Sequence, residues 1–194
     1  MARTCKILAL AGSMRRDSVN KKLVKIAAAG ARKAGAEVTI VDLNDYRLPL
    51  YHGDEEEASG LPAKAVELKK LFIEHHGFLF ASPEYNSSIS GIFKNAIDWV
   101  SRPEKSDPLY LVAFKDKVGA IMSASPGGLG GLRGLVHTRD ILENIGVLVI
   151  PDQLAVPDAY NAFNEVGQLK DAVMLDKAMG LGKQVAEMLL KLRA

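Results

Sequence analysis

A polar stretch near the N-terminus combines residue types that suit phosphate binding. The stretch 12–23, GSMRRDSVNKKL, follows an apolar run at 7–11 and precedes apolar residues at helical spacing. Its small donors and guanidinium groups are Ser13, Arg15, Arg16, Ser18 and Asn20. Because a helix N-terminus exposes unpaired N–H groups and partial positive charge, this strand–loop–helix pattern predicts a phosphate site.

Other interpretations of this stretch remain open. Ser18 and Asn20 also suit the cap and first turn of a helix, so capping alone is the alternative for those two residues. The loop lacks the G-x-x-x-x-G-K-[ST] pattern of a P-loop. The dinucleotide pattern G-x-G-x-x-G is nearly met at 128–130, but Arg133 occupies its last position. A monophosphate is therefore favoured over a dinucleotide held in the usual way.

Two further loops follow apolar runs that read as strands. The segment 83–88, PEYNSS, offers backbone donors and the flat ring of Tyr85, and such a loop can lie against a planar heterocycle. Packing of Tyr85 and turn formation by Asn86 and Ser87 are the alternatives. The segment 125–131, SPGGLGG, lets the backbone approach a ligand closely. A mobile surface turn or a subunit contact is equally consistent with it.

The elements that must position these loops alternate along the chain. Strands are predicted at 5–11, 37–43, 78–82, 118–123 and 147–150, the last stopped by Pro151. Helices are predicted at 18–34, 62–76, 89–102, 132–145 and 166–192. Residues 44–60 read as a loop, with the acid run 54–57 solvated and mobile.

This alternation predicts an α/β fold with a five-stranded parallel sheet covered by helices on both faces. Five strands and a C-terminal helix fit the flavodoxin-like order 2-1-3-4-5. The topological switch then lies between the first and third strands, and ligands bind outside the strand C-termini at that point. The three specialised loops are expected to converge there.

Composition sets the broad class. The chain has 194 residues, which fits a single domain over 1–194, and its net charge of +2 does not demand a nucleic-acid partner. The N-terminal apolar run is too short for a signal peptide or membrane span, so a cytoplasmic protein without a membrane partner is expected. The lone cysteine, Cys5, excludes an internal disulfide and reads as a small buried thiol. No catalytic triad or acid pair is evident, and neither a catalytic residue nor a metal site is predicted.

The first two loops together resemble the NAD(P)H-dependent FMN reductase family, which includes bacterial quinone and chromate reductases and azoreductases. The matching motifs are G-S-x-R-x-x-S-x-N at 12–20 and S-P-E-Y-N-x-S at 82–88, continued by G-x-x-K-N-A-I-D-W at 91–99. The resemblance spans about residues 5–150. The glycine-rich loop matches less well, and no diagnostic residue follows Pro151.

The resemblance implies that FMN is held by three sets of residues. In the first loop they are Ser13, Arg15, Ser18, Val19 and Asn20, around the phosphate. Around the ribityl chain and ring edge, mostly through backbone atoms, they are Pro83, Glu84, Tyr85 and Asn86. On the other side of the ring they are Ser123, Ser125 and Gly127. Bracing of the loop or of a subunit interface is expected from Lys94, Asn95, Asp98 and Trp99, with Trp99 alternatively in the core. Arg102 is a candidate interface residue.

The same resemblance implies an oxidoreductase that takes two electrons from NADPH or NADH and passes them through FMN to a small-molecule acceptor. Quinones, chromate, azo dyes and nitroaromatic compounds are the expected acceptors, and a homodimer or homotetramer is the expected assembly. A flavodoxin-like electron carrier without its own NAD(P)H oxidase activity is the alternative. Such carriers resemble acidic proteins, whereas this chain is nearly neutral and its phosphate loop holds two arginines. A module that binds another phosphorylated ligand is a third hypothesis.

Overall fold

The computed structural model describes residues 4–193 and contains one five-stranded parallel sheet. Its strands are β1 (Lys6–Ala11), β2 (Glu37–Val41), β3 (Gly77–Ala81), β4 (Lys117–Ala124) and β5 (Val147–Val156). They are arranged in the order β2-β1-β3-β4-β5, and every neighbouring pair is parallel. The predicted flavodoxin-like sheet order is confirmed, with the switch point between β1 and β3.

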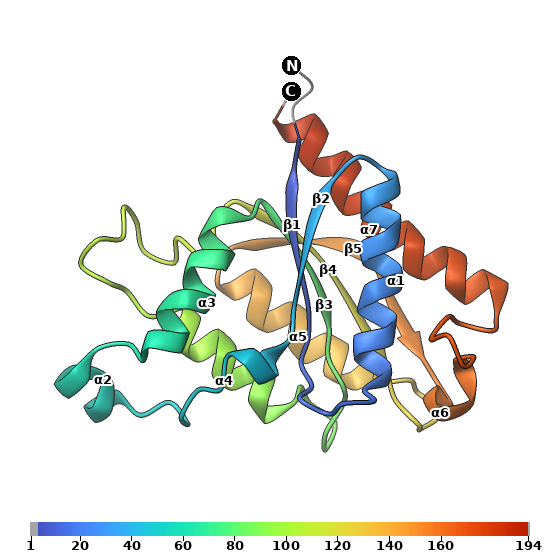
Figure 1. Cartoon of the computed structure of the whole chain (residues 1–194), viewed down its shortest axis with the longest axis horizontal. Helices are drawn as coiled ribbons and strands as arrows, with labels where there is room; N and C mark the ends of the chain where they lie inside the picture. The colour runs from blue at the N-terminus through green and yellow to red at the C-terminus, as the bar shows by residue number, and fades with distance from the viewer. Residues whose placement is uncertain (1–3, 194) are drawn as a thin grey trace.

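Helices cover both faces of this sheet (Figure 1). On one face lie α1 (Val19–Lys33) and α7 (Ala172–Leu192). On the other lie α3 (Ala63–Glu74), α4 (Gly91–Val100) and α5 (Leu132–Asn144). The shorter elements are the 3-10 helix η1 (Leu43–Asp45), α2 (Gly53–Ser59) and α6 (Ala159–Ala162).

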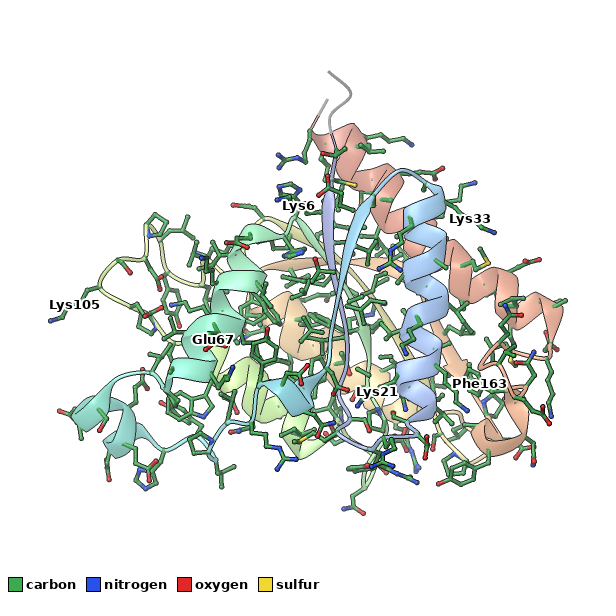
Figure 2. All side chains as sticks on the ribbon, in the orientation of Figure 1. Lys6, Lys21, Lys33, Glu67, Lys105 and Phe163 are labelled. Atoms are coloured by element: carbon green, nitrogen blue, oxygen red, sulfur yellow. The ribbon has the colours of Figure 1, made fainter. Side chains whose placement is uncertain are left out.

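The central strands are apolar throughout because both of their faces are covered. All of β3 is buried, and β1 is buried from Ile7 to Ala11. Side chains fill the space between the sheet and its two helix layers (Figure 2). Cys5 is fully buried in the core cluster on the α1 side, as expected.

Close backbone packing fixes α1 against α7. A Cβ on Gly30 would collide with the carbonyl of Met179, and a Cβ on Gly182 would collide with the carbonyl of Ala27. Both positions therefore need glycine for the two helices to approach one another. This contact fixes the C-terminal helix on the sheet beside α1, whose first turn borders the predicted phosphate loop.

The end of the fifth strand differs from the prediction. Pro151 does not stop β5, which continues to Val156. The ladder shifts register here, pairing Gly119 with Val149 and then Ile121 with Gln153. Proline is tolerated because β5 is an edge strand and the irregularity removes the need for its N–H. The extra length carries the chain to the C-terminal edge of the sheet.

Part of the segment 44–60, which was predicted as a loop, is helical. It contains η1 and α2, and the acid run 54–57 lies in α2, with three acidic residues in its first turn, where they complement the helix dipole. The hydroxyl of Tyr51 donates to Glu56 at 2.8 Å. Asn95 and Trp99 both donate to the carbonyl of Pro49 at 2.8 Å, so α4 braces this segment.

The C-terminal helix begins later than predicted. Residues 166–171 are not helical, and Asp171 caps α7 by accepting from the N–H of Met174 at 2.8 Å. The preceding segment forms α6 and a bridge between Phe163 and Leu169. The segment 151–165, between the predicted fifth strand and the predicted last helix, thus contains the end of β5 followed by the short helix α6.

Candidate FMN site

A cavity of about 260 Å³ opens at the C-terminal ends of β1, β3 and β4, at the switch point. It is lined by residues of all three predicted loops and of α6: Ser13, Arg15, Asp17, Ser18, Val19, Asn20, Pro83, Glu84, Tyr85, Ala124, Ser125, Pro126 and Tyr160. Larger cavities lie elsewhere, along α1 and α7 and at the opposite end of the sheet. We assign the site to the 260 Å³ cavity because ligands of such sheets bind where the strand order reverses.

The first loop presents donors above the start of α1. Ser18 is the N-cap and accepts from the N–H of Lys21 at 3.3 Å. Its capping role is confirmed, and the hydroxyl proton of Ser18 stays available to a ligand. The buried hydroxyl of Ser13 accepts from the N–H of Arg15 at 3.3 Å, which holds the loop in a tight curve.

Asn20 ties the first loop to the end of β4. Its amide donates to the carbonyl of Ala124 at 2.8 Å and accepts from the N–H of Ala124 at 2.9 Å. The side chain is 2% exposed and does not cap the helix. Because both ends of the amide are engaged by backbone, the role of Asn20 in the cavity is to fix α1 against β4.

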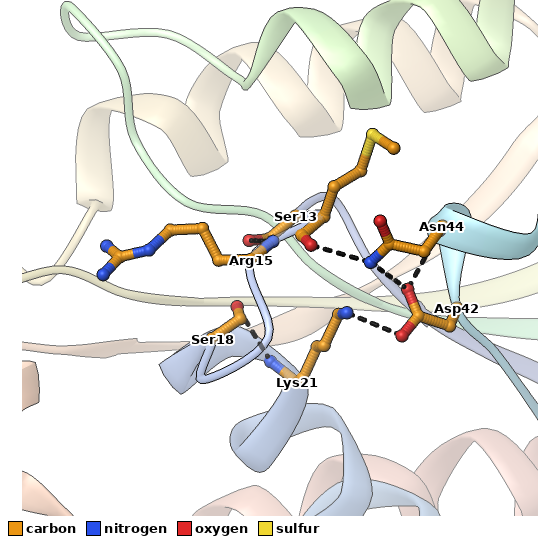
Figure 3. Close-up of polar contacts among 7 residues, drawn as sticks. Ser13, Arg15, Ser18, Lys21, Asp42 and Asn44 are labelled. Atoms are coloured by element: carbon orange, nitrogen blue, oxygen red, sulfur yellow. Dashed lines mark hydrogen bonds and ion pairs between the residues drawn. The ribbon is translucent and has the colours of Figure 1, made fainter. Parts of the chain in front are cut away.

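The other side of the first loop is fastened to the region after β2 (Figure 3). Lys21 pairs with Asp42 at 2.6 Å, and Asn44 donates to the carbonyl of Met14 at 2.7 Å. Desolvation raises the pKa of Asp42, but hydrogen bonds from Lys21 and Asn44 outweigh it and leave this pKa below its ordinary value. The charge of Lys21 is therefore neutralised within the chain.

Arg15 extends away from this network (Figure 3). Its guanidinium is exposed and forms no ion pair within residues 4–193. Its one side-chain hydrogen bond goes from Nη1 to the hydroxyl of Tyr160 at 3.5 Å, and this contact raises the pKa of Arg15. A cation at the mouth of a cavity beside a helix N-terminus is the arrangement expected for an anion site.

The charged side chain of the second loop, Glu84, is bound by residues of α5. Glu84 accepts from the N–H of Gly134 at 3.0 Å and from two nitrogens of Arg133 at 2.8 and 3.1 Å. It serves as the N-terminal cap of α5, because the cap residue itself is Gly131, which has no side chain. Burial raises the pKa of Glu84, but the bonds from Gly134 and Arg133 outweigh this effect and the pKa lies below its ordinary value.

Asn86 and Ser87 form a tight turn, as the alternative interpretation proposed. Both have positive φ, 50° and 65°, and Tyr85 and Ser88 exchange two backbone hydrogen bonds across them. This is the geometry of a two-residue hairpin turn. Ser88 also contacts His137 of α5 through its hydroxyl at 2.9 Å. Tyr85 lines the cavity and is 52% exposed.

Part of the glycine-rich loop is packed rather than open. Gly130 and Gly131 have positive φ, and a Cβ on either would collide, with the backbone at Val156 or with the hydroxyl of Ser123. These two glycines serve close packing inside the chain. Gly127 has no heavy atom within 4 Å of an added Cβ and faces open space.

Most of the predicted binding residues do converge. Nine of them line the cavity: Ser13, Arg15, Ser18, Val19, Asn20, Pro83, Glu84, Tyr85 and Ser125. Three others do not line it: Asn86, Ser123 and Gly127. The hydroxyl of Ser123 is buried and has no hydrogen-bond partner within residues 4–193. The prediction missed Asp17, Ala124, Pro126 and Tyr160, and for Tyr160 no local pattern pointed to the site.

Comparison with known proteins agrees with this geometry. The family model described as NADPH-dependent FMN reductase matches residues 5–161. The chain belongs to this family. It is 34% identical to an NAD(P)H-dependent FMN reductase of Pseudomonas aeruginosa over 95% of this chain and 92% of the relative. It is 32% identical to a quinone reductase of Escherichia coli over 93% of both chains.

The fold of this FMN reductase family member also matches a solved flavoenzyme. FerB, an NAD(P)H:(acceptor) oxidoreductase of Paracoccus denitrificans, aligns with a TM-score of 0.79 and 26% identity, covering 96% of this chain and 98% of FerB. Membership makes the protein an oxidoreductase with FMN as cofactor and NAD(P)H as electron donor. Within residues 4–193, none of the helices is long and apolar enough to span a membrane.

The residues of the cavity fit the phosphate end of FMN. The first loop supplies two hydroxyls, from Ser13 and Ser18, the backbone N–H groups of the α1 terminus and the guanidinium of Arg15. Together these groups provide neutral and charged donors around one end of the cavity, as a phosphate requires. Asp17 is the one acid of this loop, and its exposed position before the helix cap lets solvent screen its charge.

Proposed function

We propose that the protein binds FMN with its phosphate at the first loop and transfers two electrons from NAD(P)H to a quinone or another small oxidant. The observation that carries the site assignment is Arg15, an exposed cation at the α1 terminus that no carboxylate within residues 4–193 pairs with. Chromate, azo compounds and nitroaromatic compounds are further acceptors of the same two-electron chemistry.

The bound flavin supplies the redox chemistry itself, by accepting a hydride from the nicotinamide and releasing two electrons to the acceptor. The chain's residues bind and orient it. Ser13, Ser18 and Arg15 hold the phosphate, and the backbone of the second loop, from Pro83 to Asn86, borders the ribityl chain and ring. No side chain is required as an acid or a base, so no catalytic residue is proposed.

Quinones are proposed as acceptors because two relatives carry that activity in their names, the E. coli quinone reductase and a rice protein named as a probable NADPH:quinone oxidoreductase. The site is compatible with a planar acceptor, since the half-exposed aromatic residue Tyr85 lines the cavity. With Arg15 at the FMN phosphate, the exposed Arg16 suits the extra phosphate of NADPH, which would favour NADPH over NADH.

The first test is a visible spectrum of the purified protein, recorded before and after anaerobic addition of NADPH. Flavin bands that bleach on addition support the proposal, and subsequent addition of a benzoquinone should restore them. Flavin bands that neither NADPH nor NADH bleaches would favour the electron-carrier alternative. A protein that stays colourless after incubation with FMN would refute the assignment of the cavity.

We also propose that the protein is a cytoplasmic homodimer or homotetramer. Three apolar residues at helical spacing lie exposed on the start of α5 and the loop before it, Leu129, Leu132 and Val136, with 52%, 42% and 52% of their surface accessible. A stripe of this kind suits burial against a second copy. Light scattering coupled to gel filtration gives the assembly size, and a monomer would contradict the proposal. Cell fractionation tests the location.

A further inference from the structure

The aromatic hydroxyl that contacts Arg15 within residues 4–193 comes from a segment to which neither the family resemblance nor any sequence pattern gave a function. Tyr160 lies in α6, lines the cavity and accepts from Arg15 Nη1 at 3.5 Å. The contact joins the first loop to a residue 145 positions later in the chain. It spans the mouth of the cavity, between the α1 terminus and the end of β5.

The backbone around Tyr160 is firmly held. The N–H of Ala159 donates to the carbonyl of Ser125 at 3.2 Å, and the N–H of Lys170 donates to the carbonyl of Ala162 at 2.9 Å. Ala159 is fully buried, and Phe163 is 7% exposed in the core cluster on the α1 side. The ring of Phe163 also lies 5.9 Å from the ammonium of Lys22. In Figure 2, Phe163 lies at the same end of the molecule as Lys21 of α1.

The side chain of Tyr160, in contrast to the backbone around it, is exposed to solvent. It is 63% exposed, so burial of the ring does not account for its place. Its oxygen accepts from Arg15, which leaves the phenolic proton free to donate elsewhere. Arg15 in turn uses one of its five N–H donors, so the guanidinium and the phenol both have donors left for one anion.

We propose that Tyr160 is a positioning and specificity residue of the phosphate end of the site: it orients Arg15 and donates its own hydrogen bond to the phosphate of FMN. This inference rests on the proposed phosphate site at Arg15. It predicts that Tyr160 discriminates between FMN and riboflavin, which differ only in that phosphate. The ring of the flavin is recognised elsewhere, so it is bound equally well with or without the phenol.

The test compares Tyr160→Phe with the parent by fluorescence titration of both flavins into apoprotein. We expect the Kd for FMN to rise about 10-fold, because one hydrogen bond to a charged group is lost, and the Kd for riboflavin to change less than about 2-fold. In an Arg15→Ala background, Tyr160→Phe should raise the Kd for FMN by less than about 3-fold, because the phenol acts partly through Arg15.

Tyr110→Phe is the matched control. Tyr110 is 61% exposed and does not line the cavity. Its substitution by phenylalanine removes the same hydroxyl group as Tyr160→Phe does. An unchanged Kd for FMN in Tyr160→Phe would overturn the inference, and so would an equal loss of FMN and riboflavin, which indicates a structural role. A parent protein that binds neither flavin would instead refute the proposed function, and the inference with it.

Discussion

Two arginines at the same edge of the sheet differ in whether a carboxylate of the chain pairs with them. Arg133, at the start of α5, pairs with Glu84 at 2.8 Å and helps to join the second loop to that helix. Arg15, in the first loop, forms no ion pair within residues 4–193 and contacts only a neutral phenol through its side chain. The compensated charge of Arg133 helps to build the wall of the cavity, whereas the uncompensated charge of Arg15 supports the phosphate site proposed above.

Loss of the uncompensated charge is expected to have the largest effect on ligand binding. Arg15→Ala should weaken FMN binding by ~1.5–3 kcal/mol, because a charged hydrogen bond to phosphate is removed. Thermal unfolding should change little, since the side chain is exposed. Arg16→Ala is the control, because Arg16 is exposed and does not line the cavity. Equal flavin dissociation constants for Arg15→Ala and the parent would remove Arg15 from the site.

Weakening the compensated pair is expected to change stability instead. Glu84→Gln should lower the free energy of unfolding by about 1–2 kcal/mol, because the carboxylate charge is lost and the amide has one oxygen instead of two to accept from Gly134 and Arg133. Urea unfolding measures this change. The affinities for riboflavin and FMN should change alike, since Glu84 is not one of the proposed phosphate ligands and does not contact Arg15. A loss of affinity for FMN but not for riboflavin would show that the Glu84–Arg133 pair also takes part in phosphate binding, which would contradict the difference drawn between it and Arg15.

The same pair gives a pH dependence. Because the pKa of Glu84 is depressed in the folded protein, its contribution to stability is complete above the ordinary value of 4.5 and is lost as the pH falls through the folded-state pKa. The difference in unfolding free energy between the parent and Glu84→Gln should therefore be full at pH 7 and shrink below pH 4.5. A difference that stays constant down to the acid transition would show that the charge of Glu84 is not the cause.

The smallest effect is expected at Lys21, a cation near the site whose charge is compensated. Lys21→Met should cost ~0.5 kcal/mol of stability, since its pair with Asp42 is partly exposed, with 17% and 41% of the two side chains accessible. FMN affinity should fall less than about 2-fold, far less than for Arg15→Ala. Fluorescence titration with FMN distinguishes a structural role of Lys21 from a role in phosphate binding. A large loss of FMN affinity would place Lys21 in the phosphate site.

The sequence alone was sufficient for the strand order and for the convergence of the predicted loops on one cavity. Apolar runs at 7–11 and 78–82 specify strands buried on both faces, and their alternation with helices leaves few topologies open. The loops after these strands then meet at the switch point as a consequence of strand order. Local pattern also identified Ser18 as a cap, because capping depends on residues within one helical turn.

The tertiary structure alone decided which charges are free. The sequence assigned Arg15 to the phosphate, but it did not show which of Lys21, Arg15 and Arg133 pairs with a carboxylate. Contacts with Asp42, Tyr160 and Glu84 decide this. These contacts join positions 21, 145 and 49 residues apart, beyond the reach of any local pattern. For the same reason the course of β5 past Pro151 was not predictable. Proline disrupts a strand locally, but an edge position with a register shift accommodates it, and that extension brings Tyr160 to the site.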